Sequence, residues 1–344
     1  MDLYQKSQVR KIKNEHDFRF TKSLGQNFLV SREVICEIIE ASQIGERDLV
    51  IEIGPGMGTL TGLAAQRARK LIAVEIDSDL IPILKETLAE YGKVVAISDD
   101  VAVSGKDAAE TGTKDIGDAA GADIVIVNDD ILKTDLAAMI RAAKAADPGI
   151  EGVRIIGNLP YYITTPIIMK ILREDLPAAN VPDISPGDSG APADSITIMM
   201  QKEVADRIKA APGSKTYGAL SVAVQYYCEV SEVCEAPAEC FEPRPKVDSE
   251  VLRLDIREQR AVSVKDEDLF FDCVKAGFSQ RRKTLANCMK NLSRTSLGKE
   301  EIAVVLADAG IEPVRRAETL SIEEFGALAD SVYRKLKTGL GQVE

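Results

Sequence analysis

The segment Gly157-Asn158-Leu159-Pro160-Tyr161 places an amide, a proline and an aromatic ring directly after a run of apolar residues. The side-chain oxygen of Asn158 and a backbone carbonyl held rigid by Pro160 give two hydrogen-bond acceptors, and Tyr161 adds a flat face. A planar ring that carries an amino group, such as adenine, matches this set. Two acceptors aimed at its N–H bonds favour a more tetrahedral nitrogen, whose lone pair can attack a methyl sulfonium. The alternative is a proline turn with a packed tyrosine.

A second candidate site is the glycine-rich stretch Glu52-Ile53-Gly54-Pro55-Gly56-Met57-Gly58, between a predicted strand and a predicted helix. Glycines at such a turn let the backbone approach a ligand closely, at the edge where open α/β sheets bind ligands. A dinucleotide fingerprint needs its third glycine at position 59, which is Thr59. The spacing found here, with an acid two residues before Gly54, favours a ligand of the S-adenosylmethionine type, which has no pyrophosphate. A plain tight turn is the alternative.

Two further acids follow predicted strands. Glu75 lies near the end of the second strand, where a carboxylate can accept hydrogen bonds from both ribose hydroxyls of an adenosine. Asp130 follows the third strand and can accept from the exocyclic amine of the cofactor's adenine. Asp129 competes for that role, and the residues at 98–100 repeat the pattern of 128–130. A surface acid at the end of a strand is the alternative interpretation of Glu75.

Metal and histidine chemistry have little support in the sequence. His16 is the only histidine, and it stands among charged residues near the N-terminus. The cysteines form no C-x-x-C pair, so we expect free thiols that pack as small apolar side chains. The sequence therefore predicts no metal site and no Ser-His-Asp triad.

Alternating strands and helices must hold the candidate residues on one edge of a sheet. Apolar runs predict strands at 49–53, 71–77, 124–127, 153–158, 195–200, 229–236 and 249–256. Helical spacing predicts helices after an N-cap at Ser31, at 59–68, at 80–88, from Pro166 and at 201–209. This alternation indicates an α/β protein with a parallel sheet covered on both faces. The segment at 217–227 fits either a strand or a buried helix.

After about residue 258 the strand signals stop, and helical patterns follow at 269–292, at 299–309 and, after a capping box at Ser321, to about 337. We expect a basic N-terminal arm at 1–30, a catalytic domain at 31–258 and a helical domain at 262–340. Segments rich in small and turn-forming residues, at about 98–122 and 176–194, are predicted to be surface insertions. No apolar run is long enough for a membrane helix and no signal peptide is evident, which predicts a cytoplasmic protein with no membrane contact.

The formal net charge of −12 argues against a bulk nucleic-acid binder, but the charge is unevenly spread. Residues 1–32 carry a net charge of +4 and residues 270–299 a net charge of +6. The second segment contains Arg281, Arg282 and Lys283 in a row. These segments can form a local footprint for a polyanion, and solvated helix faces are the alternative.

Taken together, the motifs resemble those of the ribosomal RNA adenine dimethyltransferases, the family that makes N6,N6-dimethyladenosine. The resemblance is carried, in chain order, by KSLGQNFLV (22–30), EIGPGMGTLT (52–61), VEID (74–77), NDDIL (128–132), GNLPYYITTPII (157–168), FEPRPKVDSEVLRL (241–254) and FSQRRKTLANCM (278–289). It implies a class I methyltransferase fold dependent on S-adenosylmethionine, Rossmann-like, with a seven-stranded, mostly parallel sheet and a small all-helical C-terminal domain. Both predicted insertions are longer than is usual in the family.

The resemblance also implies roles for particular residues. Those expected to contact the cofactor are Asn27, Leu29, Gly54, Gly56, Glu75, Asp130 and Asn158. Those expected in catalysis are Asn158, Leu159, Pro160, Tyr161 and Phe241, with Phe241 stacking on the face of the target adenine opposite Tyr161 after the base is flipped out. Arg281, Arg282 and Lys283 are expected to contact RNA phosphates.

The expected substrate is 16S rRNA, within a small ribosomal subunit or its precursor, and the protein is expected to be a monomer. The expected sites are two adjacent adenosines near the 3′ end of that RNA. The nearest rival is a 23S rRNA adenine N6-methyltransferase of the macrolide-resistance type; KSLGQNFL and FSQRRKTL favour the small-subunit branch by likeness. A non-catalytic assembly or transcription factor and an enzyme for small-molecule amines are the rivals from other classes.

Overall fold

The computed structural model describes residues 3–21, 24–98, 119, 121–175 and 193–340. Most of the two predicted insertions, together with Lys22 and Ser23, lies outside these residues. The chain divides into two compact units. Unit 1 comprises residues 1–205 and 230–256, and unit 2 comprises 206–229 and 257–344. Unit 2 thus includes residues 206–229, which the sequence had assigned to the catalytic domain.

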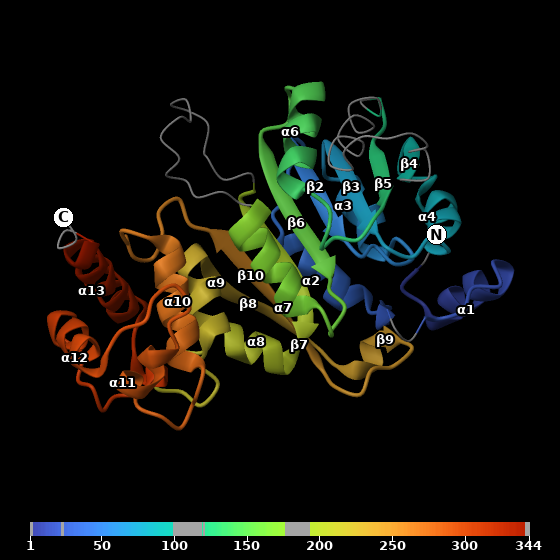
Figure 1. Ribbon diagram of the computed structural model, residues 1–344. Helices are drawn as coiled ribbons and strands as arrows, with labels where there is room; N and C mark the ends of the chain where they lie inside the picture. The colour runs from blue at the N-terminus through green and yellow to red at the C-terminus, as the bar shows by residue number, and fades with distance from the viewer. Residues whose placement is uncertain (1–2, 22–23, 99–118, 120, 176–192, 341–344) are drawn as a thin grey trace. The chain divides into compact units, whose positions relative to one another are not determined.

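The central sheet has eight strands in the order β4-β5-β3-β2-β6-β7-β10-β8 (Figure 1). Its strands are β2 (Asp48–Ile53), β3 (Lys70–Glu75), β4 (Val94–Ser98), β5 (Ile124–Asn128), β6 (Gly152–Asn158), β7 (Ser195–Gln201), β8 (Cys228–Ala236) and β10 (Ser249–Ile256). The pairs from β4 to β7 are parallel, and β10 runs antiparallel to β7. The predicted α/β class with a mostly parallel sheet is confirmed.

The predicted number of seven strands is wrong, because β4 was missed. β4 pairs in parallel with β5, with Val94 opposite Ile124 and Ser98 opposite Asn128. It is an edge strand whose described side chains are only half-buried, and it ends where the turn-rich segment begins. A run this short beside such a segment has too little periodicity to be separated from a loop.

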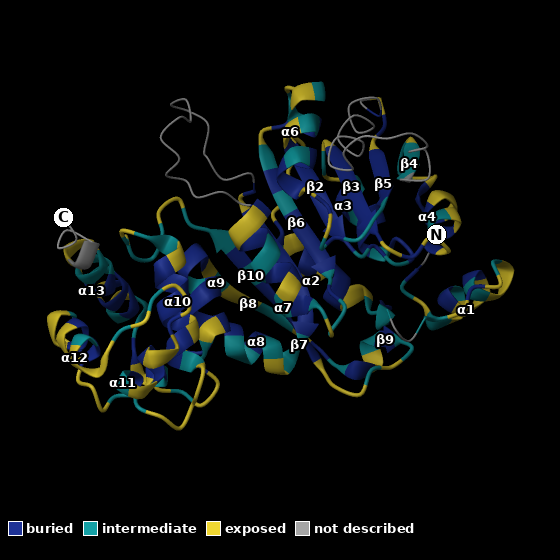
Figure 2. Cartoon of the chain, viewed as in Figure 1, coloured by how far each residue is buried: buried dark blue, intermediate teal, exposed yellow. Residues whose placement is uncertain are grey.

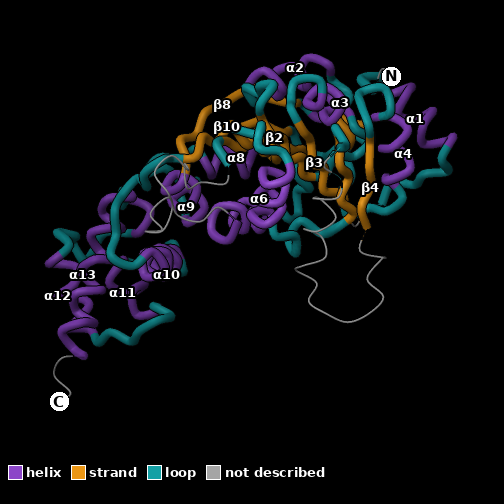
Figure 3. Tube along the Cα trace, turned by 90° about the horizontal axis from the view of Figure 1, so that it is seen from above, coloured by secondary structure: helices purple, strands orange, loops and turns teal. Residues whose placement is uncertain are grey.

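Helices cover both faces of the sheet in unit 1, and Figure 3 shows α2 and α3 on one face and α6 on the other. The helices of this unit are α1 (Lys6–Glu15), α2 (Arg32–Ala41), α3 (Thr59–Ala65), α4 (Leu80–Leu88), α6 (Leu136–Ala146) and α7 (Thr164–Lys170), which continues as a π-helical turn at Ile171–Asp175. Helix α8 (Lys202–Ile208) follows β7. The Ser31 hydroxyl accepts the backbone N–H of Val34, which confirms the predicted cap of α2.

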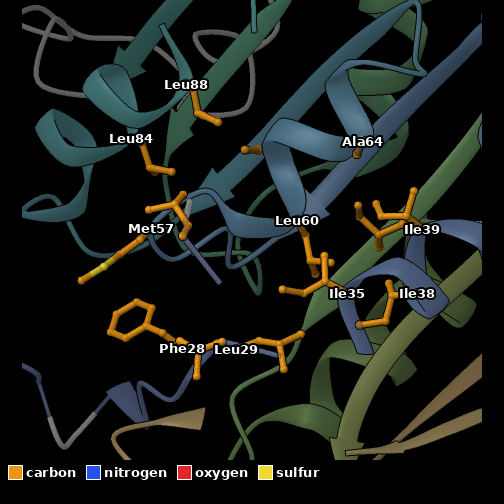
Figure 4. Packing of buried hydrophobic residues seen from close by; sticks show 14 of the residues in the cluster. Phe28, Leu29, Ile35, Ile38, Ile39, Met57, Leu60, Ala64, Leu84 and Leu88 are labelled. Atoms are coloured by element: carbon orange, nitrogen blue, oxygen red, sulfur yellow. The ribbon is translucent and has the colours of Figure 1, made fainter. Parts of the chain in front are cut away.

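The central strands of unit 1 are buried along their length, as the dark blue ribbons of Figure 2 show. Figure 4 shows part of the hydrophobic core, in which Phe28 and Leu29 lie near Met57 and Leu60. The N-terminal segment contributes Val9, among others, to the same core. Phe28–Leu29 form the short strand β1, which pairs with β9 (Phe241–Glu242). The segment predicted as a separate arm therefore packs as part of unit 1.

Unit 2 is helical, with α9 (Ala219–Tyr227), α10 (Glu267–Phe278), α11 (Leu285–Cys288), α12 (Lys299–Asp308) and α13 (Ile322–Leu340). The ambiguous segment at 217–227 is thus mainly the helix α9. At the start of α13, Ser321 and Glu324 exchange side-chain to backbone hydrogen bonds of 3.2 and 2.9 Å, which confirms the predicted capping box.

The continuous helix predicted at 269–292 is wrong, because α10 ends at Phe278. The Ser279 hydroxyl donates to the Ala276 carbonyl at 2.6 Å, which competes with helix continuation. Thr284 is extended, and the Leu285 N–H donates to the Arg315 carbonyl at 2.7 Å instead of the preceding turn. The basic residues at 281–283 consequently lie on an exposed turn and not in the middle of a helix.

Candidate active site

One cavity in unit 1 opens at the carboxyl ends of β2, β3, β5 and β6, where open α/β sheets bind their ligands. Its walls come from the loop before β1 and from the segments that follow these four strands. The lining includes all but one of the residues predicted for the cofactor and for catalysis: Asn27, Leu29, Gly54, Gly56, Glu75, Asp130, Asn158, Leu159, Pro160 and Tyr161. The structure therefore brings together residues that lie more than a hundred positions apart in the chain.

The glycine turn between β2 and α3 is required by its geometry. Gly54, Gly56 and Gly58 all have positive φ angles, of 68°, 59° and 89°. A Cβ atom at Gly56 would stand 2.9 Å from the ring of Phe28, and one at Gly58 would stand 3.0 Å from Leu88. Side chains at these positions would strain the backbone and collide with the core. The turn forms part of the cavity wall.

Glu75 is held at the edge of the sheet by two backbone donors. Its carboxylate accepts the N–H of Asp77 at 2.9 Å and the N–H of Gly56 at 3.3 Å. Burial nevertheless raises the pKa of Glu75 to about 7, with the two backbone hydrogen bonds opposing the shift. The two hydrogen bonds thus fix the carboxylate in place, but they only partly offset the cost of burying its negative charge.

Glu52 is the acid two residues before Gly54, and it also lines the cavity. Neither of its buried carboxylate oxygens has a hydrogen bond of standard geometry within the described residues. Burial raises the pKa of Glu52 to about 8; the nearby Thr61 hydroxyl opposes this shift and the Glu75 carboxylate adds to it. A buried acid without a partner favours a cationic ligand, because a positive charge would supply the missing interaction.

Asp130 is better placed than Asp129 to contact a ligand. Both oxygens of Asp129 are occupied, by the Asp130 N–H at 2.7 Å and by the Thr134 hydroxyl at 2.8 Å. Asp130 accepts the Leu132 N–H with one oxygen, and its other oxygen lies 3.7 Å from the ammonium of the exposed Lys133. Of the repeated pattern at 98–100, only Ser98 is described, and it pairs with Asn128.

Asn158 ends β6 with its amide in a defined orientation. Its Nδ2 donates to the backbone carbonyl of Asn27 at 2.9 Å, which leaves Oδ1 as an acceptor. The Pro160 carbonyl is already occupied by the Ile163 N–H at 3.2 Å and the Thr164 hydroxyl at 3.0 Å. No described group donates to the carbonyl of Leu159. The backbone acceptor of this turn that remains available to a ligand is therefore the Leu159 carbonyl.

Tyr161 is anchored through its hydroxyl, which lies 2.7 Å from the hydroxyl of Ser249. Burial raises the pKa of Tyr161, so the phenol stays neutral and can hold this hydrogen bond. The next residue, Tyr162, also lines the cavity and is 55 % exposed. Its ring lies against Gly25, where an added Cβ would stand 3.3 Å from Cδ1 of the tyrosine.

Phe241 is the one predicted catalytic residue that the structure does not bring to the cavity. Its side chain is 0 % exposed and belongs to the core of unit 1, and its backbone pairs with Leu29. Stacking on a base would require the ring to leave this core, so its position does not support the predicted role. The segment at 241–254 reaches the site through Ser249, which contacts Tyr161.

Residues that the sequence prediction omitted complete the site: Gln26, Glu52, Tyr162 and Ser249. Glu52 could have been predicted, because it is the acid two residues before Gly54 in the glycine motif. Gln26 and Tyr162 lie inside the family motifs, but no local sequence feature distinguishes them from their neighbours. The contact of Ser249 joins residues 88 positions apart, which no local pattern encodes.

The basic residues Arg281, Arg282 and Lys283 are exposed on the α10–α11 turn of unit 2. The Arg281 guanidinium donates to the backbone carbonyl of Lys215 in the same unit. Within the described residues, no group of three or more His, Cys, Asp or Glu side chains is arranged to hold a metal ion. None of the described helices combines the length and apolar character needed to cross a membrane.

Known proteins are similar to this chain in sequence and in fold. A family model described as ribosomal RNA adenine dimethylase matches residues 17–104 and 113–330. The chain belongs to this family. The break in the dimethylase match, between residues 104 and 113, falls inside the first predicted insertion.

Curated relatives in the dimethylase family match almost the whole chain. The chain is 41% identical over 330 residues to "Ribosomal RNA small subunit methyltransferase A" of Clostridioides difficile, covering 96% of each protein. It is 43% identical over 328 residues to the protein of the same name from Alkaliphilus oremlandii, covering 95% of this chain and 97% of the relative.

Solved structures support the dimethylase fold. A dimethyladenosine transferase from Plasmodium falciparum aligns with a TM-score of 0.63 at 23% identity, covering 91% of this chain and 98% of the other. The 23S rRNA methyltransferase ErmE aligns with a TM-score of 0.56 at 22% identity, covering 89% and 100%.

We predict that Glu52→Gln raises the stability of the ligand-free protein at alkaline pH. The folded protein holds the Glu52 proton up to a pKa of about 8, against 4.5 for the unfolded chain. Between these values the unfolded state ionises first, so the wild-type free energy of unfolding falls as pH rises, by on the order of 3–5 kcal/mol. Urea unfolding from pH 4.5 to 8 measures the difference, with Glu46→Gln as an exposed control. Parallel pH profiles for wild type and Glu52→Gln would contradict the burial effect.

We predict that Phe241 contributes to stability more than to base recognition. Phe241→Ala should lose about 3–5 kcal/mol of unfolding free energy, because it opens a cavity in the core. Phe241→Leu keeps most of the apolar volume and should keep RNA methylation close to wild type. Thermal unfolding and methyl transfer at varied RNA concentration measure both effects. A folded Phe241→Leu variant with a strongly reduced kcat would restore the stacking role.

Proposed function

We propose that this protein transfers methyl groups from S-adenosylmethionine to the N6 amines of two adjacent adenosines near the 3′ end of 16S rRNA, giving N6,N6-dimethyladenosine during maturation of the small ribosomal subunit. The observation that carries the proposal is the Asn158 turn. Its amide nitrogen is bound to Asn27 at 2.9 Å, and Oδ1 and the Leu159 carbonyl remain as acceptors beside the glycine turn. Family membership supports the reaction, and the names of the relatives support the small subunit as the target.

The lining of the cavity fits S-adenosylmethionine. This cofactor supplies an electrophilic methyl group on a positively charged sulfur. Glu52, Glu75, Asp129 and Asp130 make the cavity acidic, and the unpartnered carboxylate of Glu52 suits a cationic ligand. Glu75 would accept from the ribose hydroxyls and Asp130 from the adenine amine, while Asn27, Leu29 and the glycine turn would contact the remainder.

The residues of this chain would act on the target adenine mainly by positioning it. The Asn158 Oδ1 and the Leu159 carbonyl would accept the two N–H bonds of the amine and draw it out of conjugation with the ring. The ring of Tyr161, fixed by Ser249, would stack on the base, and such contacts are worth about 1–3 kcal/mol per base. The target adenine must be extruded from its RNA helix to reach the Asn158 turn at the carboxyl end of the sheet.

The exposed basic turn at 281–283 would contact RNA phosphates and leave recognition of the target base to the cavity. The reaction would take place in the cytoplasm, where ribosomal subunits mature. A 23S rRNA activity of the macrolide-resistance type is the alternative substrate, and the names of the relatives favour the small subunit over it. The complete acceptor set at Asn158 argues against a non-catalytic factor.

A primer-extension stop assay on 16S and 23S rRNA, from cells with and without this gene, tests the proposal. We expect gene-dependent stops at two adjacent adenosines near the 3′ end of 16S rRNA and unchanged 23S rRNA. A gene-dependent stop on 23S rRNA alone would establish the alternative. Absence of any gene-dependent stop would support the non-catalytic interpretation.

We predict that Asn158→Ala lowers the rate constant of methyl transfer by about 100-fold or more, because one of the two acceptors is lost. Asn158→Asp retains an oxygen acceptor but loses the hydrogen bond to Asn27. Its methyl-transfer rate constant should therefore fall less than that of Asn158→Ala. Single-turnover kinetics give the rate constants, and thermal unfolding checks the fold. Wild-type rates in a folded Asn158→Ala variant would refute the positioning role.

We predict that charge reversal of Arg281, Arg282 and Lys283 weakens RNA binding and flattens its dependence on salt. Each lost phosphate contact should reduce the slope of log K against log salt by about 1. Binding to a 16S rRNA fragment at several salt concentrations measures the slope. Lys265→Glu, an exposed charge reversal elsewhere in unit 2, is the control. An unchanged slope would show that the basic turn does not contact RNA.

A further inference from the structure

The loop before β1 presents one backbone carbonyl to the catalytic amide. The Asn27 carbonyl accepts the Nδ2–H of Asn158 at 2.9 Å. The Asn27 side chain in turn donates to the Gly25 carbonyl at 2.9 Å, and Gly25 has a φ of 61°, which closes a tight turn. The orientation of the Asn158 amide therefore depends on where this turn holds the carbonyl. A displaced carbonyl would free the amide to rotate and would misdirect Oδ1.

Gln26 ties the same turn to the rest of unit 1. Its Nε2 donates to Oδ2 of Asp77 at 2.5 Å, and its Oε1 accepts the Thr21 N–H at 2.8 Å. Asp77 is 8 % exposed, follows β3 and does not line the cavity. Its other oxygen accepts the Asp79 N–H at 3.1 Å, which orients the carboxylate toward Gln26.

A chain of contacts thus connects the two ends of the site. Glu75 accepts the backbone N–H of Asp77 at 2.9 Å, Asp77 accepts from Gln26, and the residue after Gln26 carries the carbonyl that binds Asn158. Because Glu75 is fixed in the sheet, these hydrogen bonds hold the loop before β1 in a fixed position relative to the sheet. Hydrogen bonds of this supporting kind change rates strongly, because small displacements of a reacting group are costly.

We infer that the hydrogen bond between Gln26 and Asp77 positions Asn158 for methyl transfer, by fixing the Asn27 carbonyl to which the Asn158 amide donates. This inference rests on the proposed function, because it assigns Asn158 the acceptor role. Gln26 and Asp77 are positioning residues and make no contact with the reacting amine. Gln26 also lines the cavity, so its replacement can affect cofactor affinity as well. Asp77 is the cleaner probe, since it acts on the site only through other residues.

A double-mutant cycle separates this role from a merely structural one. Gln26→Ala, Asp77→Ala and the double variant are compared with wild type by single-turnover methyl transfer to a 16S rRNA fragment at saturating cofactor. Each single variant should be about 10-fold slower, and the double variant should be no slower than the slower single variant, because both remove the same contact. Asp77→Asn keeps one oxygen that can accept from Gln26 but loses the second acceptor, used by the Asp79 N–H, so it should be closer to wild type than Asp77→Ala.

Two further measurements control for folding and for cofactor affinity. Thermal unfolding checks each variant, and Glu46→Ala, which removes an exposed carboxylate elsewhere in unit 1, is the control and should keep the wild-type rate. The dissociation constant of S-adenosylmethionine, measured by calorimetry, should change little in Asp77→Ala.

Rate losses that multiply in the double variant would overturn the inference, as would an Asp77→Ala loss confined to cofactor affinity or unchanged rates in both single variants. Failure of the proposed function is distinguishable from these outcomes. In that case wild type itself would not methylate the 16S rRNA fragment, whereas the positioning inference fails only on an active wild-type background.

Discussion

The site depends on the direction in which one amide points. An asparagine side chain can present either an oxygen or an NH2 group to a ligand, and only the oxygen can accept from an adenine amine. At Asn158 this choice is made by the Asn27 carbonyl, which takes the Nδ2–H at 2.9 Å. The partner arrives from a loop 131 positions earlier in the chain, and β1 holds that loop through its pairing with β9. Closing the N-terminal segment onto unit 1 is therefore part of forming the site.

The distribution of charge follows from having two ligands of opposite sign. The cofactor is cationic at sulfur and RNA is a polyanion, so one surface cannot serve both. The acids lie in a cavity of unit 1, where burial raises the pKa values of Glu52 and Glu75 and a positive ligand would offset the cost. The basic turn at 281–283 is exposed on unit 2. An overall charge of −12 is then compatible with RNA binding, because the proposed contacts with phosphates would be local.

Sequence predicted those features that local chemistry determines. The Ser31 cap, the glycine turn, the buried parallel strands and the Asn158 turn each depend on residue types within a few positions. Prediction failed where contacts between residues far apart in the sequence determine the structure. The half-buried strand β4 exists because β5 pairs with it. The chain after Phe278 does not continue as one helix to 292, and where helix resumes, at Leu285, the backbone N–H donates to the distant Arg315 carbonyl. The contact of Gln26 with Asp77 spans 51 positions and that of Tyr161 with Ser249 spans 88, so neither leaves a local pattern.

The segment at 241–254 shows why the residue with the most obvious chemistry need not be the one that touches the site. Phe241 is an aromatic residue near two prolines, and the family resemblance predicted that it stacks on the base. Its side chain is fully buried, and its backbone pairs with Leu29. Ser249, a small residue at the start of β10, reaches the cavity through the hydroxyl of Tyr161. A ring proposed to stack on a base would benefit from being rigid before the base arrives, since ordering it on binding would cost conformational entropy. A hydrogen bond at the far end of the ring provides that rigidity without obstructing its face. Phe241 contributes in another way, because it is buried in the core and its backbone pairs with Leu29, which lines the cavity.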